Sequence, residues 1–408
     1  MAPFRFVQLS DVHLGAHPFA RHPLLSDLTP ARIAALHTAF DTAVSCAKEN
    51  VVDAILIPGD LFDAADPPDD PLNAAIDLLE KAAPIPVVIV PGNHDPTGAD
   101  SPWSPDGPLM RSRGRRWGDH VQIVTSRTWQ RVELPDRPDV CLMTRSFHDV
   151  DRDRDPLEGL PSKPDGTTGV LMFHGSQMGG APPGDEGVVG PFSTEKLSQV
   201  GYDYAAVGHY HSCRHLVQGG SLLGGYSGCL LGQTLSETGA KGFLLVGLQG
   251  DTAVKESDVV FCSSGGGDIV RLEADVGEIT HQKALLDLVG KALVDSNIDR
   301  SDIVIVELSG LIDPSVDLTT LLDGELNQLL HADCARLIVS ADDVRPDYGL
   351  ELDSGLSDID GSSVEAEFKR EMLNRFRDNS DGPENQEIIR RALYYGLDAL
   401  SGGQVRWR

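Results

Sequence analysis

The sequence predicts an α/β protein built around a parallel sheet. Short runs of apolar, largely β-branched residues alternate with stretches of helical periodicity at Phe4–Leu9, Ala54–Ile57 and Val87–Val90. Strands this apolar are typical of a sheet that is covered on both faces, and a strand–helix–strand series makes parallel, right-handed connections. The 408 residues are enough for this large core and a second unit, so we expect two domains.

Each of the first three strands runs directly into polar residues. These follow as Ser10-Asp11-Val12-His13, Pro58-Gly59-Asp60-Leu61-Phe62-Asp63 and Pro91-Gly92-Asn93-His94-Asp95. Helices are expected between the strands over Ala31–Glu49, which begins after Pro30, and over Leu72–Ala82. Open α/β sheets bind their ligands at the carboxyl ends of parallel strands, so these polar ends are expected to meet at one edge.

The middle of the chain indicates a second, mixed sheet. Its strands are expected at Val121–Val124, Val132–Leu134, Val140–Thr144, Gly169–Phe173, Tyr204–Val207, Leu222–Gly232 and Gly242–Leu248, with a short helix at Phe192–Gln199. His174 follows one of these strands and Gly208-His209-Tyr210-His211 another. We interpret Asp149–Pro164 as an exposed linker loop. The Thr97–Arg116 loop is too long for a plain connector, and its basic end is either a solvated loop or a contact to a phosphate backbone.

A flexible stretch at Ser263–Asp268 marks a domain boundary. Beyond it we expect strands at Ile269–Leu272, Ile303–Leu308 and Ala335–Ala341, and helices at Ile279–Asp295, Leu318–His331, Ser363–Arg377 and Glu384–Leu400. We therefore divide the chain into a main domain at 1–262, a small α/β domain at 269–345 and a helical segment at 346–408.

The composition indicates a soluble protein, and we expect a cytoplasmic one. The six cysteines are scattered without a Cys-x-x-Cys pair, as is typical of reduced thiols. The first strand begins too early to leave room for a signal peptide, and no apolar run approaches a membrane span. The net charge of −28 argues against unaided nucleic-acid binding, which needs a basic patch, bound metals or a basic partner.

Together the strand ends offer a set of metal-ligand side chains. They are Asp11, His13, Asp60, Asn93, His94, His174, His209 and His211. Asp11 and His13, two apart on an extended segment, should point to the same side, as should His209 and His211. The mixed set suits Mn²⁺, Fe²⁺ or Zn²⁺. It is too large for one ion, but two ions about 3.5–4 Å apart, bridged by a carboxylate and a hydroxide, would use it fully. The alternative is a series of unrelated polar turns.

This ordered set resembles the calcineurin-like metallophosphoesterase superfamily over roughly Phe4–Leu248. More narrowly, the chain resembles the Mre11/SbcD DNA-repair exonucleases, in particular their YhaO-type bacterial branch. The narrower resemblance rests on Gly59–Asp63, on His174–Gly179 followed by Phe192–Leu197, on Gly201–His211 and on the small C-terminal α/β domain. Protein Ser/Thr phosphatases instead carry Gly-Asp-x-x-Asp-Arg-Gly, whereas Ala64 and Ala65 follow Asp63 here.

The resemblance implies a four-layer α/β/β/α sandwich with a smaller C-terminal α/β capping domain. It also implies a role for each ligand. Asp11, His13 and His211 would hold the first ion, Asn93, His174 and His209 the second, and Asp60 would bridge them. His94 would protonate the departing oxygen, with Asp63 orienting it, although many Mre11-like nucleases have His at the position of Asp63. Mn²⁺ is the expected metal, with Fe²⁺ and Zn²⁺ as alternatives.

We therefore expect a metal-dependent phosphodiesterase of the Mre11/SbcD type, a DNA exonuclease or endonuclease that cleaves P–O bonds with a hydroxide held by two ions. The implied partners are DNA, an SMC/Rad50-like coiled-coil ATPase and a second copy of the chain. Residues for substrate binding are not evident beyond the candidates His17, Arg21 and Arg115. The first alternative, favoured by the acidic charge, is a phosphoesterase for small or cyclic nucleotides. The second is a binding module that has kept the fold without catalysis.

Overall fold

The computed structural model of the chain describes residues 3–98, 101–104, 110, 114–179, 187–250, 252–313, 316, 318, 333–347, 363–378 and 383–400. Contacts divide it into two compact units. The first is Met1–Val270 with Asp299–Val304 and Cys334–Arg336, and the second holds the rest of the chain to Arg408. The three-part domain division stays a prediction. Nearly all of the predicted helix Leu318–His331, and part of the basic loop end, lie outside the described residues.

The first unit contains the predicted parallel sheet. Its strand order is β12-β11-β1-β2-β3-β4, with β1 at Phe4–Gln8, β2 at Ala54–Pro58, β3 at Val87–Val90, β4 at Val121–Ile123, β11 at Gly242–Leu248 and β12 at Val259–Ser263. Strands β1 to β4 are parallel, while β11 and β12 add antiparallel neighbours. The connecting helices are α1 (Thr29–Glu49) and α2 (Asp69–Glu80). The expected βαβ series is therefore confirmed.

Two assignments to the second sheet are wrong. The strand predicted at Val121–Val124 pairs with β3 in the first sheet, where the Val124 amide donates to the Ile89 carbonyl and β4 becomes the edge strand. The strand at Gly242–Leu248 pairs with β1. The edge strand β12 was not expected, although it contains the apolar run Val259-Val260-Phe261-Cys262, and most of its residues are exposed or half-buried.

A second six-stranded sheet has the order β5-β6-β7-β8-β10-β9. Its strands are Gln130–Val132 (β5), Val140–Thr144 (β6), Thr168–His174 (β7), Tyr204–Gly208 (β8), Arg214–Gln218 (β9) and Ser221–Tyr226 (β10). Strands β6, β7, β8 and β10 are parallel. The strand predicted to reach Gly232 ends at Tyr226, and the preceding antiparallel β9 was not predicted. Helix α4 covers Thr194–Gln199.

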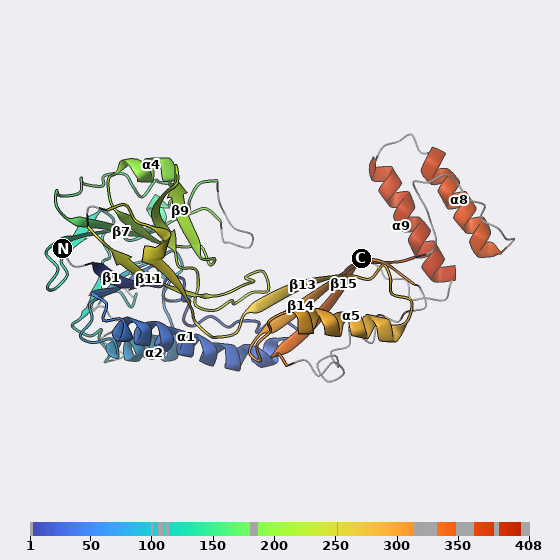
Figure 1. Ribbon diagram of the computed structural model, residues 1–408, viewed down its shortest axis with the longest axis horizontal. Coiled ribbons are helices and arrows are strands. Elements are labelled where there is room, and N and C mark those ends of the chain that lie inside the picture. Colours follow the sequence, from blue (N-terminus) through green and yellow to red (C-terminus); the bar gives the residue numbers. More distant parts are fainter. Residues whose placement is uncertain are drawn as a thin grey trace. The chain divides into compact units, whose positions relative to one another are not determined.

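The two sheets face each other and form a four-layer sandwich, as the resemblance implied. Phe6, Leu56 and Val88 from the first sheet pack with Val170 and Met172 from the second in one buried cluster. Alternate residues of the first sheet point outward, and there they pack beneath α1 and α2. The outer face of the second sheet packs with residues at α4, which lies on the opposite side of the sandwich from α1 and α2 (Figure 1).

The remaining elements belong mostly to the second unit. Strands β13 (Ile269–Asp275), β14 (Ile303–Ile312) and β15 (Arg336–Pro346) form a three-stranded sheet, and α5 covers Gln282–Asp295. Helices α8 (Val364–Asp378) and α9 (Pro383–Leu400) pack through a small cluster of Phe368, Met372, Leu373, Ile389, Leu393 and Leu397. Among the described residues, none of the helices combines the length and the apolar character needed to cross a bilayer.

The interpretation of Asp149–Pro164 as an exposed linker is wrong, because Asp151 anchors this segment to the rest of the unit. This carboxylate is buried and accepts two hydrogen bonds from Arg127, from Nε at 2.5 Å and Nη2 at 2.6 Å. The Arg145 guanidinium lies 3.5 Å away. The alternation of Asp and Arg, which suggested a solvated loop, instead fixes this segment to the second sheet through charge-assisted hydrogen bonds.

Replacing Asp151 with asparagine is expected to destabilise the protein in a pH-dependent way. Hydrogen bonds from Arg127 lower the pKa of Asp151 to about 2, so its stabilisation is present above the pKa of the unfolded chain, about 3.9, and is lost as the pH falls toward 2. Because Arg127 is half-exposed, we expect the substitution to lower the free energy of unfolding by about 1–2 kcal/mol at pH 7. Urea unfolding at pH 7 and pH 3 would measure it. Asp149→Asn, at an exposed ion pair, is the control, and an equal difference at both pH values would contradict this account.

Candidate metal centre

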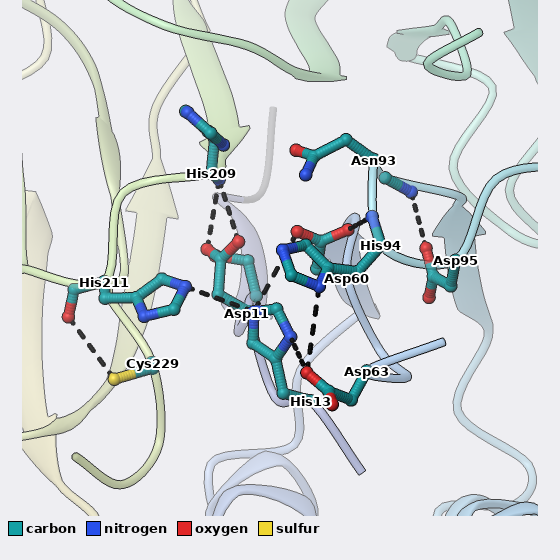
Figure 2. A network of polar contacts seen from close by, with 12 residues as sticks. Asp11, His13, Asp60, Asp63, Asn93, His94, Asp95, His209, His211 and Cys229 are labelled. Carbon is teal, nitrogen blue, oxygen red and sulfur yellow. Dashed lines mark hydrogen bonds and ion pairs between the residues drawn. The ribbon is translucent and has the colours of Figure 1, made fainter. Parts of the chain in front are cut away.

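The ends of β1, β2, β3, β7 and β8 bring most of the predicted ligands into one place (Figure 2). The tips of β1 and β2 are joined by backbone hydrogen bonds from Asp11 N to Gly59 O and from His13 N to Asp60 O. Positive φ angles occur at Asp11 (53°), His13 (51°), Asp60 (51°) and His209 (118°). Such backbone is uncommon outside glycine and often marks a functional site. The expectation that these tips are extended is therefore wrong, although their side chains still converge.

The first group of ligand atoms comes from Asp11, His13 and His211. These atoms all lie within 4.8 Å of one another. The Nε2 atoms of His13 and His211 are 3.1 Å apart, while His211 donates from Nδ1 to Oε1 of Glu237 at 2.6 Å. Asp11 is fully buried and accepts hydrogen bonds from the Ser10 hydroxyl and the His209 amide.

The second group is built around Asp60 and His174. Asp11, Asp60 and His174 form another set with ligand atoms within 4.8 Å. His174 Nε2 lies 3.4 Å from Asp60 Oδ2 and 2.8 Å from Asn93 Oδ1, and His174 donates from Nδ1 to the Pro58 carbonyl. The other oxygen of Asp60 accepts from the His94 amide at 2.8 Å. Asp60 thus touches both groups, since His13 Nε2 is 3.9 Å from it.

His209 is the predicted ligand that the structure joins to the others least directly. It belongs to none of the His, Cys, Asp and Glu sets found within the described ranges. Its ring centroid lies 5.3 Å from that of His174. Its Nε2 lies 3.1 Å from the Gly187 carbonyl and must donate to it, which leaves Nδ1 as the acceptor nitrogen. Burial, and next the charge of His174, lower the pKa of His209 to about 3, so the ring is neutral, as a ligand must be.

His94 and Asp63 lie beside the first group. The His94 ring meets the His13 ring edge-on, with centroids 4.6 Å apart, and its side chain is 22% exposed. Oδ1 of Asp63 is 3.7 Å from His94 Nδ1 and 3.3 Å from His13 Nδ1 (Figure 2). Asp63 is therefore placed to interact with both imidazoles, and its orienting role for His94 stays a prediction.

The donor set fits divalent cations. His174 and His211 each donate from Nδ1 to a group that can only accept, so each presents the lone pair of Nε2. These lone pairs face Asn93 Oδ1 and His13 Nε2. The contact between the two acceptors His174 Nε2 and Asn93 Oδ1 is favourable only with a cation or proton between them. Burial raises the pKa of Asp11. Burial also acts to raise the pKa of Asp60, but the charges of His174 and His13 outweigh this effect, and the pKa of Asp60 is lowered.

The supporting roles of two carboxylates, Asp95 and Glu237, were not predicted from the sequence. Asp95 is buried and accepts from the amides of Phe62 at 3.0 Å and Gly92 at 2.7 Å, which ties the tips of β2 and β3 together. It stood in the polar run after β3 but had no assigned role. Glu237 holds His211 and lies in the loop after β10, where no spacing or strand end singles it out.

The substrate-binding candidates receive no support as a group. His17 and Arg21 are exposed, and neither belongs to a candidate ligand set within the described ranges. Arg115 forms an ion pair with Asp77 of α2. The loop that carries it is anchored by Trp103 and Trp117, which stack at 5.9 Å in the core. The roles of His17, Arg21 and Arg115 in binding substrate stay predictions.

This chain is similar to known proteins over much of its length. Residues 4–213 match the family described as calcineurin-like phosphoesterase. The uncharacterized metallophosphoesterase YhaO of Bacillus subtilis is 26% identical over 302 residues, which cover 70% of this chain and 66% of that protein. The DNA double-strand break repair protein Mre11 of Aeropyrum pernix is 29% identical over 228 residues, 52% of this chain and 49% of that protein.

The match covers less than two thirds of the length of either relative. Among solved structures, TT1561 of Thermus thermophilus aligns over 65% of this chain and 100% of its own at 14% identity, with a TM-score of 0.34, too low to support an argument. The predicted resemblance to the Mre11 and YhaO branch is confirmed by the two relatives, at low identity. The family match spans just over half of the 408 residues, and the chain therefore belongs to the calcineurin-like phosphoesterase family.

Proposed function

We propose that this phosphoesterase is a dinuclear, metal-dependent phosphodiesterase that cleaves DNA, as an exonuclease or endonuclease in DNA repair. The observation that carries the proposal is the convergence of two buried carboxylates and several imidazoles, with Asp60 in contact with both groups. The choice of DNA is supported by the similarity to a protein named for double-strand break repair.

In this proposal Asp11, His13 and His211 hold one ion, Asn93, His174 and His209 hold the other, and Asp60 holds both. Two divalent ions, preferably Mn²⁺, with Fe²⁺ or Zn²⁺ as alternatives, would when bound activate water for attack and stabilise negative charge on the phosphate. His94 donates a proton to the departing oxygen, a task that suits a partly exposed imidazole near neutral pH. Asp63 would orient that imidazole, since its Oδ1 lies 3.7 Å from His94 Nδ1.

A second candidate is a phosphoesterase for small or cyclic nucleotides at the same site. The net charge of −28 favours it, because an acidic protein repels a long polyanion such as DNA. A small phosphoester would instead be held mainly by the metal ions. For the DNA function we propose a basic or DNA-bound partner of the SMC/Rad50-like ATPase kind and a homodimer, in the cytoplasm. Size-exclusion chromatography with light scattering, with and without such an ATPase, would test the assembly.

Substrate choice is tested by adding Mn²⁺ to protein stripped with chelator and assaying duplex DNA beside bis-p-nitrophenyl phosphate. We expect hydrolysis of both, and loss of both on renewed chelation. Cleavage of the small diester and cyclic nucleotides, with intact DNA even when the ATPase partner is present, would favour the second candidate. Stoichiometric metal binding with hydrolysis of no substrate would contradict both.

A further inference from the structure

His211 is held by hydrogen bonds both to its backbone carbonyl and to its ring. Its carbonyl oxygen accepts from the Cys229 amide at 3.2 Å, from the Cys229 thiol at 3.4 Å and from the Lys241 ammonium at 3.1 Å. Its ring is held separately, by the hydrogen bond from Nδ1 to Glu237. Figure 2 shows His211 between Cys229 on one side and the His13 ring on the other.

Both carboxylate oxygens of Glu237 accept hydrogen bonds. Its side chain is 8% exposed. Oε1 accepts from His211 at 2.6 Å, while Oε2 accepts from the amides of Gln233 at 2.5 Å and Thr234 at 3.2 Å. The loop that carries it is tied to the first strand tip, because Gln233 donates from its side chain to the Val12 carbonyl at 3.4 Å.

This arrangement decides the tautomer of His211. An ionised carboxylate only accepts hydrogen bonds, so His211 must carry its proton on Nδ1 and present the lone pair of Nε2 to His13 and Asp11. A carboxylate behind a ligand imidazole orients the ring and strengthens it as a donor to a metal. Such a partner is expected for a ligand histidine, but its identity could not be read from the sequence.

We infer that Glu237 is a positioning residue for the first metal ion, acting through His211. The inference rests on the proposed function, because it assumes that His211 is a ligand. A plainer reading is that Glu237 only braces its own loop through Gln233 and Thr234. The two readings differ in what a change at Glu237 does to the imidazole, and this makes them separable.

Glu237→Gln is the decisive variant. It keeps the size of the side chain and one acceptor oxygen, and two backbone donors claim that oxygen. The new amide group then faces His211 and donates to Nδ1, so the proton moves to Nε2, the atom that should bind metal. Glu237→Asp keeps the charge and tests rescue. Asp302→Asn is the matched control, because Asp302 is a buried carboxylate that accepts from two backbone amides, of Asp268 and Asp299.

Two measurements test the inference on the full chain without any substrate. Titration of stripped protein with Mn²⁺ in a calorimeter should show one of two sites weakened about 10–100-fold in Glu237→Gln, partly recovered in Glu237→Asp and unchanged in Asp302→Asn. Nitrogen NMR of the histidines should show the His211 proton on Nδ1 in the stripped wild type and on Nε2 in Glu237→Gln.

Unchanged Mn²⁺ affinity in a folded Glu237→Gln protein would overturn the inference and leave the loop-bracing reading. Wild-type protein that binds two ions but hydrolyses no phosphodiester would defeat the proposed function alone, since the titration would still test Glu237. Wild-type protein that binds no Mn²⁺ would defeat both.

Discussion

Asp60→Asn is expected to abolish tight binding of both metal ions and to lower phosphodiester hydrolysis by about 10³-fold or more. Asp60 contacts the imidazoles of His13 and His174, so its charge is shared between the two groups. Bound ions contribute several kcal/mol to the transition state, and each 1.36 kcal/mol is a factor of ten in rate. Elemental analysis of purified protein, together with rates on bis-p-nitrophenyl phosphate, would measure both effects.

Asparagine is preferred to alanine at this position for two reasons. It tolerates the positive φ of 51° at Asp60, and its side-chain oxygen can still accept from the His94 amide. The loss should therefore come from the removed charge and not from a collapsed turn, and circular dichroism would check the fold. Asp41→Asn, at a surface ion pair with Lys81, should keep full metal content. Two ions per chain in Asp60→Asn would refute a bridging role.

The predictable part of the fold is the part governed by local sequence pattern. Strands such as β2 and β3 are apolar on both faces, and a Pro-Gly pair marks the end of each one. Their position and parallel pairing therefore follow from the residues alone. Strand β12 is an exposed edge, and β4 is three residues long. A strand was expected at β4, but the sheet that it joins depends on the edge that β3 offers, which is a tertiary property that a pattern of residues does not carry.

The candidate site divides in the same way. Side chains at strand ends could be identified because parallel strands deliver their carboxyl ends to one edge. The conformation that brings them together could not, since Asp11 and His13 point inward through left-handed backbone rather than by strand alternation. Glu237 was missed because it comes from an irregular loop, where no strand end or residue spacing marks it, and it reaches the site through the His211 side chain.

His94→Ala is expected to retain both ions and yet lose about 10²–10⁴-fold in turnover, the range for a lost general acid. His94 shares one set of ligand atoms with His13 and Asp60, but Asp11, His13, His211, Asp60 and His174 also meet in two sets that do not include it. Its hydrogen bond to Asp60 comes from the backbone amide, which alanine keeps. Equal metal loss in His94→Ala and Asp60→Asn would make His94 a ligand instead of an acid.

The leaving group distinguishes an acid from a residue that merely shapes the site. A p-nitrophenolate departs readily without a proton, whereas the alkoxide released from a nucleotide sugar departs poorly unless it is protonated. His94→Ala should therefore lose far more activity on a dinucleotide or on DNA than on bis-p-nitrophenyl phosphate. Asp63→Asn should show the same bias in weaker form, because Asp63 would act on the departing oxygen only through the His94 ring, from which it lies 3.7 Å away. An equal loss on both kinds of substrate would mean that His94 positions the phosphate and that the departing oxygen takes its proton from elsewhere.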